Sequence, residues 1–206
     1  MSTPTIPGSS EQILGGPSLR GRRFALEPFT PDHHRALYQL ITHEQINFRW
    51  RFRGAIPPYE LFLQNLNAGV LQQFVVTVLG QPDALVGFVV AYNASPQDGT
   101  CYLGAVMAPE FRVGGLESIG LFLRHLFSVW PFRKIYLEAP EYNVAAFASG
   151  IRMGLLKEEA RFRENEFFAG RYWDRFVFAI YRGDAERFSE SYPTLFVQEV
   201  TALETD

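Results

Sequence analysis

The sequence predicts one domain of the α/β class, built on a mixed, mostly antiparallel sheet with helices on both faces. Its 206 residues, 47% of them apolar, suit a single domain with a full-sized core. Strand-like and helical patterns alternate along the chain, with hairpins first and a crossover helix in the second half. Because a crossover helix joins parallel strands, the sheet is expected to be mixed.

Composition divides the chain into three parts. Residues 1–18 are small and polar and are interrupted by Pro and Gly, which predicts a flexible leader. Residues 19–183 carry the strand and helix patterns and form the expected domain. Residues 184–206 form a tail that is expected to pack on the domain or extend it, with one helical turn at 184–189 and either a strand or a loop at 194–200.

The predicted order is a strand, two helices, three strands, a helix, a strand, a helix and two strands. Thr30 and Pro31 supply an N-cap and a first-turn proline, a turn is expected at 81–83, and Pro131 and Gly154 end the later helices. The expected strands are 23–27, 74–79, 85–92, 100–107, 134–139, 156–163 and 171–181, and the expected helices are 31–43, one from about 58, 116–130 and 143–153.

Composition also excludes several functional classes. The formal net charge of −3 and the lack of a basic run argue against a nucleic-acid partner. No apolar run approaches the roughly 20 residues that a membrane span needs. The single cysteine, Cys101, forms no internal disulfide and suits a reducing compartment. The N-terminus lacks the pattern of a signal peptide, so we expect a cytoplasmic protein without a membrane partner.

The stretch from the strand at 100–107 into the following helix carries the main functional signal. Gly114 and Gly115 allow positive φ and leave no Cβ beside a bound anion. The first N–H groups of the helix and its dipole favour negative charge, and Arg112 adds a positive charge. A pyrophosphate is the natural ligand for this turn. The alternative is an ordinary strand-to-helix turn that happens to contain two glycines.

Four motifs in this order resemble the GNAT superfamily of N-acetyltransferases over about residues 20–182. Val106-x-x-Pro109-Glu-Phe-Arg112-x-x-Gly115 resembles its acetyl-CoA-binding motif. Leu137-Glu-Ala-Pro-Glu-Tyr-Asn143 resembles the strand and asparagine beside the pantetheine arm, and Gly154-Leu-Leu-Lys-Glu-Glu resembles the entry to the penultimate strand. Gly170-Arg-Tyr-Trp-Asp174 resembles a signature of the subgroup that acetylates ribosomal-protein N-termini and many small amines.

The resemblance implies acetyl-CoA or another acyl-CoA as co-substrate, with no metal. It implies that Arg112 lies against phosphate and that Val106 and Met107 bond the pantetheine amides. Asn143 would meet the cofactor arm, although Asn is also a good helix N-cap by itself. The backbone N–H groups that would hold the pyrophosphate are those of Val113, Gly114, Gly115, Leu116 and Glu117.

The sequence also departs from the family pattern. Glu117 stands where the family prefers Gly or Ala, and its carboxylate would repel a phosphate unless the cofactor tilts or the side chain turns away. Ala146 stands at the usual serine of the ribosomal subgroup. Gly150 stands where other members place a tyrosine acid, and Tyr102 stands where many keep a glutamate base.

Acyl transfer to an amine needs a base, often acting through water, and a proton for the leaving thiol. Candidate bases are Glu138, Glu141 and Glu44, each of which has the alternative of being a solvated surface acid. Tyr102 and Ser149 are candidate acids that equally suit structural roles. Cys101 lacks the sequence context of a nucleophile, and no spacing typical of metal ligands is present.

The alternating run Phe48-Arg-Trp-Arg-Phe-Arg53 has three interpretations. It suits an edge strand with one charged face. It also suits an acceptor-side wall, beside Glu44, in which Arg49, Arg51 or Arg53 binds a carboxylate or a phosphate. Stacking on nucleic-acid bases is the third, and the acidic overall charge argues against it.

Two functions follow from the sequence. The first is an N-acyltransferase that uses acyl-CoA and a small amine or a peptide N-terminus as acceptor. The second is a non-catalytic acyl-CoA-binding or interaction protein on the same scaffold, which the missing acids and Glu117 favour. The aromatic residues near Tyr172 and in the tail suit either a homodimer contact or core packing.

Overall fold

The computed structural model describes residues 19–50 and 52–196, so the predicted leader, Arg51 and the end of the tail lie outside the described residues. The sheet has seven strands in the order β1-β2-β3-β4-β5-β7-β6. The strands are β1 Phe24–Pro28, β2 Val70–Val78, β3 Gln81–Ser95, β4 Thr100–Met107, β5 Lys134–Pro140, β6 Lys157–Phe168 and β7 Arg171–Tyr181. The helices are α1 His34–Thr42, α2 Tyr59–Leu66, α3 Gly115–Val129, α4 Ala148–Arg152 and α5 Arg182–Ser191. The 3-10 turns are η1 Pro31–His33, η2 Asn47–Arg49, η3 Pro109–Gly114, η4 Glu141–Phe147 and η5 Pro193–Leu195.

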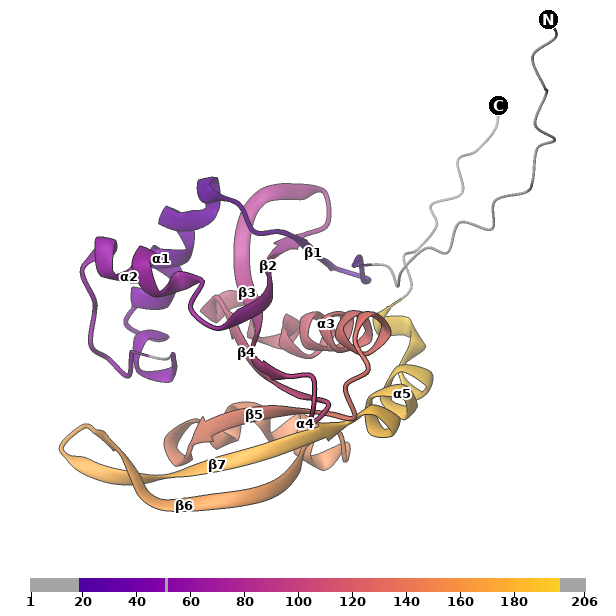
Figure 1. The fold of residues 1–206 in the computed structure, drawn as a ribbon. Coiled ribbons are helices and arrows are strands. Elements are labelled where there is room, and N and C mark those ends of the chain that lie inside the picture. The colour runs from indigo at the N-terminus through magenta and orange to yellow at the C-terminus, as the bar shows by residue number, and fades with distance from the viewer. Residues whose placement is uncertain (1–18, 51, 197–206) are drawn as a thin grey trace, which may run out of the picture.

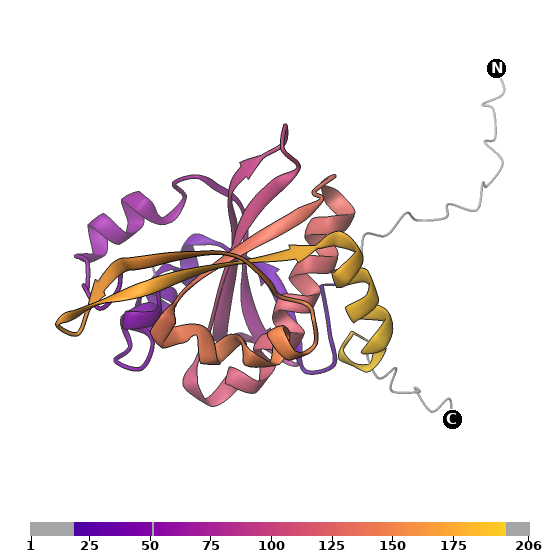
Figure 2. The same ribbon diagram turned by 90° about the horizontal axis from the view of Figure 1, so that it is seen from below.

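Helices cover both faces of the sheet, as predicted (Figures 1 and 2). On one face α1 and α2 bury Leu37, Ile41 and Phe62 against Phe88 of β3. On the other face the apolar side of α3 joins a larger core with the inner side chains of the central strands. Side chains therefore alternate along each central strand between two separate apolar layers. All strand pairs are antiparallel except β4 with β5, which confirms the mixed sheet.

The parallel pairing of β4 with β5 is short. It joins Thr100 to Lys134, Cys101 to Ile135 and Tyr102 to Tyr136, and then ends. Beyond this point β4 stays paired with β3 as far as Met107, and β5 stays paired with β7 as far as Pro140. Each half of the sheet therefore keeps its own twist while the two halves diverge, and an opening forms in the middle of the sheet.

The structure corrects three expectations about local elements, the last of which concerns α5. The first hairpin turns at Leu79–Gly80, where Gly80 has a φ of +80°, whereas residues 81–83 already belong to β3. Positive φ suits glycine, so Gly80 marks the turn. The sequence predicts the turn later because proline, which the stretch 81–83 contains, is also common in turns. The helix expected at 143–153 is divided into the 3-10 turn η4 and the short helix α4.

The predicted single turn at 184–189 is a ten-residue helix, α5. Its Phe188 is buried, and a Cβ at Gly120 of α3 would lie 3.3 Å from the Phe188 ring. The Arg182 guanidinium at the start of α5 donates to the carbonyls of Phe127, Trp130 and Phe132 at and beyond the end of α3. These tertiary contacts stabilise a helix whose own sequence is mostly polar.

Strand β1 is joined to the start of α3 by a buried carboxylate. Glu117 is 5% exposed, and its Oε1 accepts the backbone N–H groups of Arg23 at 2.8 Å and Phe24 at 3.0 Å. A Cβ at Gly21 would lie 2.5 Å from the same oxygen, so a glycine there makes room for the contact. Glu117 therefore satisfies two N–H groups at the start of β1 that lie next to the first turn of α3.

A ring packs at the same junction. A Cβ at Gly114 would lie 2.2 Å from the Phe24 ring, whereas a Cβ at Gly115 would meet Met107 Cγ at 3.6 Å, an ordinary contact distance. The two adjacent glycines therefore have different roles: Gly114 allows β1 and α3 to approach closely, and Gly115 leaves open space.

We expect Glu117→Ala to destabilise the protein by about 2 kcal/mol or more, because two backbone N–H groups lose their acceptor in a buried place. Glu117→Gln keeps one acceptor oxygen and should cost less. Urea denaturation measures the free energy of unfolding. The exposed neighbour Glu110 is the control, and Glu110→Ala should stay within about 0.5 kcal/mol of the parent. Equal stability of the Glu117 and Glu110 variants would contradict the assigned role.

Gly114→Ala should lower the free energy of unfolding by about 1–3 kcal/mol, because the new methyl group overlaps the Phe24 ring. Gly115→Ala is the matched control and should leave stability unchanged or slightly higher, since alanine favours helix. Both are measured by the same denaturation curves. A Gly115 variant that is less stable than the Gly114 variant would refute the different roles of the two glycines.

Candidate active site at the opening between β4 and β5

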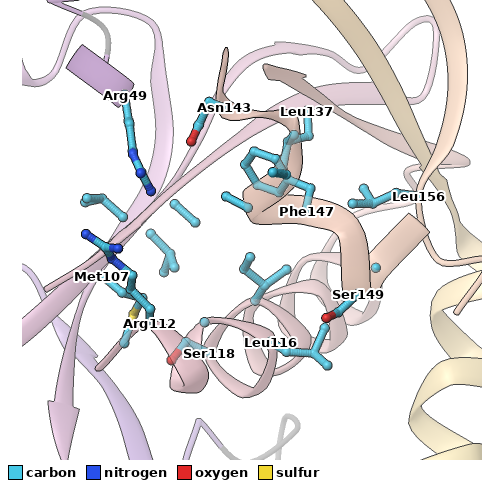
Figure 3. A pocket seen from close by; sticks show the side chains of 18 of the residues that line it. Arg49, Met107, Arg112, Leu116, Ser118, Leu137, Asn143, Phe147, Ser149 and Leu156 are labelled. Atoms are coloured by element: carbon cyan, nitrogen blue, oxygen red, sulfur yellow. The ribbon is translucent and has the colours of Figure 1, made fainter. Parts of the chain in front are cut away.

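A cavity of about 700 Å³ lies where β4 ends and α3 begins, and we call it the α3 cavity. Its walls come from the end of β4, the first turn of α3, the η4–α4 segment and the loop after α1 (Figure 3). Apolar side chains such as Leu116, Phe147 and Leu156 dominate the lining, and Arg49, Arg112 and Asn143 are its main polar groups.

A second cavity of about 390 Å³ lies beside Glu166, and we call it the Glu166 cavity. It is lined by η2 and the segment after it, by β3, β4 and β5, and by the β6–β7 hairpin. The two cavities share the lining residues Arg49, Trp50, Ala105, Leu137, Tyr142, Asn143 and Phe147. Ala105 and Leu137 belong to the diverging parts of β4 and β5, so the two cavities meet at the opening in the sheet.

The glycine turn does not use the conformation that the sequence suggested. Gly114 has a φ of −76° and Gly115 a φ of −58°, so both are right-handed and neither uses the positive φ that glycine allows. η3 leads directly into α3, and this continuous winding needs helical angles at both positions. Gly115 lines the α3 cavity and is free of contacts closer than 3.6 Å at its Cβ position.

Several predicted cofactor residues gather around the α3 cavity. Val106, Met107, Arg112 and Leu116 line it together with Gly115. Arg112 is exposed at the rim, and its Nη2 donates to Gln45 Oε1 at 3.1 Å. The backbone of Val113 and Gly114 lies in η3, immediately before these residues.

Glu117 differs from the expectation of a carboxylate that crowds a phosphate. Its side chain points to the start of β1, where its Oε1 accepts the N–H groups of Arg23 and Phe24. It is not among the lining residues of either cavity, so its carboxylate does not obstruct the turn. The sequence left open either a tilted cofactor or a side chain that turns away, and the structure shows that the side chain turns away.

Asn143 and Arg49 place unpaired polar atoms at the junction of the two cavities. Asn143 is 8% exposed, and its Oδ1 is buried without a hydrogen-bond partner. Pro140 precedes η4 and Phe147 precedes α4, so Asn143 is not a helix N-cap. Arg49 Nε is likewise buried and unpaired. Figure 3 shows both side chains directed into the α3 cavity.

Charged groups of the Glu166 cavity form a network around Arg175. Arg175 Nε lies 2.5 Å from Glu166 Oε1, and Arg175 Nη1 lies 3.3 Å from Glu138 Oε2. Arg53 Nε lies 3.4 Å from the other oxygen of Glu166. Glu138 therefore lines a cavity, as a candidate base should, but its carboxylate is already ion-paired. Glu166 was missed in the sequence because nothing marks a glutamate in a hairpin strand that is otherwise charged and exposed.

Tyr142 is a second residue that sequence reasoning missed. It lines both cavities, and its hydroxyl donates to the Phe48 carbonyl at 3.0 Å. Burial raises the pKa of Tyr142, nearby Glu166 raises it further, and Arg53 and Arg175 oppose that rise. Its position directly before Asn143 was the available signal, since η4, which follows β5, carries both neighbours to the opening.

Other predicted residues lie elsewhere. Glu44 and Glu141 are exposed and line neither cavity. Tyr102 lies at the last residue pair before the opening, with its ring between those of Tyr92 and Tyr136. Burial, then the charge of Glu138, raise the pKa of Tyr102. Ser149 is an exposed residue at the edge of the α3 cavity.

Neither a thiolate nor a metal centre is found in the described part of the chain. Cys101 is buried, and burial raises the pKa of its thiol to about 12, so it stays protonated. The described residues contain no group of three or more His, Cys, Asp or Glu side chains that could hold a metal ion. Among those same residues, no helix is long and apolar enough to cross a membrane.

The sequence comparisons find no relative, since no family model and no curated protein matches the sequence. The comparison with solved structures finds proteins of the same architecture. Among solved structures, spermidine N-acetyltransferase from Vibrio cholerae in complex with CoA and spermine is 21% identical, with 79% of this chain and 98% of that chain covered and a TM-score of 0.68. A GCN5-related N-acetyltransferase from Brucella melitensis is 20% identical over 89% of this chain and 88% of that chain, with a TM-score of 0.68.

A third similar structure is the ribosomal L7/L12 α-N-protein acetyltransferase in complex with CoA. It is 16% identical over 77% of this chain and 94% of that chain, with a TM-score of 0.62. At these identities the likeness concerns the fold, and it spans nearly the whole length of each compared protein. The chain therefore has the fold of the GNAT N-acetyltransferases, as its motif order predicted.

Proposed function

We propose that this protein is an N-acyltransferase that moves an acetyl or another short acyl group from acyl-CoA to a primary amine of a small molecule or a peptide N-terminus. The observation that carries this proposal is the junction of two cavities at the opening between β4 and β5. Two substrates that enter from the two cavities would meet there, away from bulk water, with their reacting groups side by side.

The residues of the α3 cavity fit acyl-CoA. The positive end of the α3 dipole and the Arg112 guanidinium suit its pyrophosphate, although the Gly115 N–H itself already donates to the Arg112 carbonyl. The apolar walls suit its pantetheine arm, which carries amide N–H groups. The buried, unpaired Oδ1 of Asn143 is an acceptor that such an N–H would satisfy. Once bound, acyl-CoA supplies the thioester whose carbonyl carbon accepts the amine.

The proposed reaction forms a C–N bond, breaks a C–S bond and moves protons at both ends. The amine must lose a proton and the leaving sulfur must gain one. We assign the second role to Tyr142, which lines both cavities and whose hydroxyl carries a proton near neutral pH, as that of an ordinary tyrosine does. Of the predicted bases, Glu138 alone lines a cavity, so we retain it as the acceptor of the amine proton through water.

One observation favours the second function, an acyl-CoA-binding protein without turnover. Glu138 and Glu166, the acidic residues that line the Glu166 cavity, are both paired with Arg175. Neither carboxylate can take up the amine proton without giving up an ion pair with Arg175. Glu117, which favoured this function at the level of sequence, no longer supports it because its side chain turns away from the turn.

Two further predictions about the protein's setting stay open to test. A homodimer contact would suit the β6–β7 hairpin, where Phe167 and Tyr172 are 58% and 63% exposed. A cytoplasmic location remains the expectation that the single cysteine suggests.

We expect CoA to raise the melting temperature of the protein, because a ligand at 100 times its Kd adds about 2.7 kcal/mol of stability. We also expect thiol release from acetyl-CoA when a panel of primary amines is added. Binding and release are measured by thermal unfolding and by a thiol-reactive dye. Binding without release across the panel would leave only the non-catalytic function, and failure to bind CoA would contradict both functions.

Tyr142→Phe should lower kcat by about a hundredfold, because the leaving sulfur loses its proton donor, and it should change KM little. Tyr38→Phe is the matched control. Tyr38 also donates its hydroxyl to a backbone carbonyl, that of Pro57 at 2.7 Å, yet it lines neither of the two cavities. Steady-state kinetics compare the variants. Equal loss of kcat in both would assign Tyr142 a purely structural role.

A further inference from the structure

Arg49 occupies a position that no other cation of the described site shares. It lies in η2, and it lines both the α3 cavity and the Glu166 cavity, whereas Arg112 lines only the first and Arg53 and Arg175 only the second. Its guanidinium lies over the Phe48 ring at 4.9 Å, and its Nε is buried without a hydrogen-bond partner. Figure 3 shows it extending from η2 into the space between Asn143 and Arg112.

The surroundings of Arg49 disfavour its positive charge. Burial lowers the pKa of its guanidinium, and the nearby charge of Arg112 lowers it further. Arg112 donates to the neutral oxygen of Gln45, and neither arginine forms an ion pair with a carboxylate of the described residues. Two cations facing one cavity are unfavourable unless an anion lies between or beside them. The site therefore has an unmet requirement for negative charge.

The Glu166 cavity cannot meet this requirement by itself. Among the described residues its lining carries three arginines and two glutamates, and both glutamates are paired with Arg175, with Arg53 as a second partner of Glu166. A polycationic amine would need unpaired carboxylates on this wall, and the described lining has none. An anionic substituent on the acceptor would instead find Arg49 without a competing acid.

We propose that the acceptor is an amine that carries an oxyanion, in the simplest case a carboxylate, and that Arg49 binds this group. The inference rests on the proposed acyl transfer and adds the substrate class. Arg49 is then a specificity-determining residue. The proposed site for the diphosphate of CoA is at Arg112 and the start of α3, which line only the α3 cavity. Arg49 also lines the Glu166 cavity, from which the acceptor would enter.

A positive acceptor wall has a consequence for the chemistry. Guanidinium groups near a bound ammonium favour its neutral form, since like charges lower the pKa of an amine. The wall would thus assist the loss of the amine proton even though Glu138 and Glu166 are ion-paired.

The test uses full-length protein loaded with CoA and matched pairs of amines that differ only in the anionic group. The probes are glycine and glycinamide, phenylalanine and phenylalaninamide, and phosphoethanolamine and ethanolamine, with spermidine as a polycation. Calorimetry measures Kd, and thiol release from acetyl-CoA measures kcat/KM. The variants are Arg49→Gln, Arg49→Lys and the control Arg35→Gln, which removes the same charge from an exposed site on α1 outside both cavities.

In the parent we expect at least one anionic amine to bind about tenfold or more tightly than its uncharged partner, the usual scale of a charge-assisted contact. Arg49→Gln should reduce this ratio to about threefold or less, Arg49→Lys should keep an intermediate ratio, and Arg35→Gln should keep the full one. Raising NaCl from 0.05 to 0.5 M should reduce the preference of the parent, a measurement that needs no variant.

Three outcomes would overturn the inference. In the first, the protein binds no anionic amine more tightly than its uncharged partner. In the second, it binds spermidine more tightly than every anionic amine. In the third, Arg49→Gln weakens the binding of CoA about tenfold while the preference for anionic amines persists, which would assign Arg49 to the cofactor's phosphates. Failure of the proposed function looks different. In that case the anionic amines bind with the expected preference to the CoA-loaded protein, but no thiol is released, and the binding inference stands.

Discussion

The central constraint on this molecule is that the pairing of β4 with β5 ends after three residue pairs. Each strand keeps an antiparallel neighbour on its other side, so neither can bend back to extend the shared ladder. The sheet divides in its middle, where most proteins bury a continuous core. Both cavities, the orphaned Oδ1 of Asn143 and the junction where two substrates would meet all follow from that divergence.

The charged residues of this protein divide into a set that is paired within the fold and a set that has no acidic partner among the described residues. Glu117 is used by the fold, because its Oε1 accepts the N–H groups of Phe24, the first residue of β1, and of Arg23 directly before it. Glu138 and Glu166 are engaged by arginines on the hairpin side of the opening. Arg49 and Arg112 lack such acidic partners among the described residues. The surplus of positive charge therefore collects at the two cavities, although the chain as a whole carries a formal charge of −3.

Much of the fold and part of the site could be predicted from local patterns. The strand at Thr100–Met107 and the helix after Gly115 have clear apolar periodicity, and Arg112 with the helix start marked the turn that lines the α3 cavity. Tyr142 and Glu166 could not be found this way. Their importance comes from contacts with η2 and β7, which lie far away in the chain. The sequence predicts that the Glu117 carboxylate would repel a phosphate, because it holds no sign that the start of β1 would present two N–H groups to that carboxylate.

The sequence by itself determined the order of the elements, the position of the glycine turn proposed to bind the cofactor, and the presence of cations in the segment before α2. These properties depend on neighbouring residues and on periodicity, which a single chain displays directly. Only the tertiary structure decided where Glu117 points, which glutamates are ion-paired and which arginine lines both cavities. Those outcomes depend on how β1, η2 and the β6–β7 hairpin pack around the opening, and distances between such remote segments have no local signature.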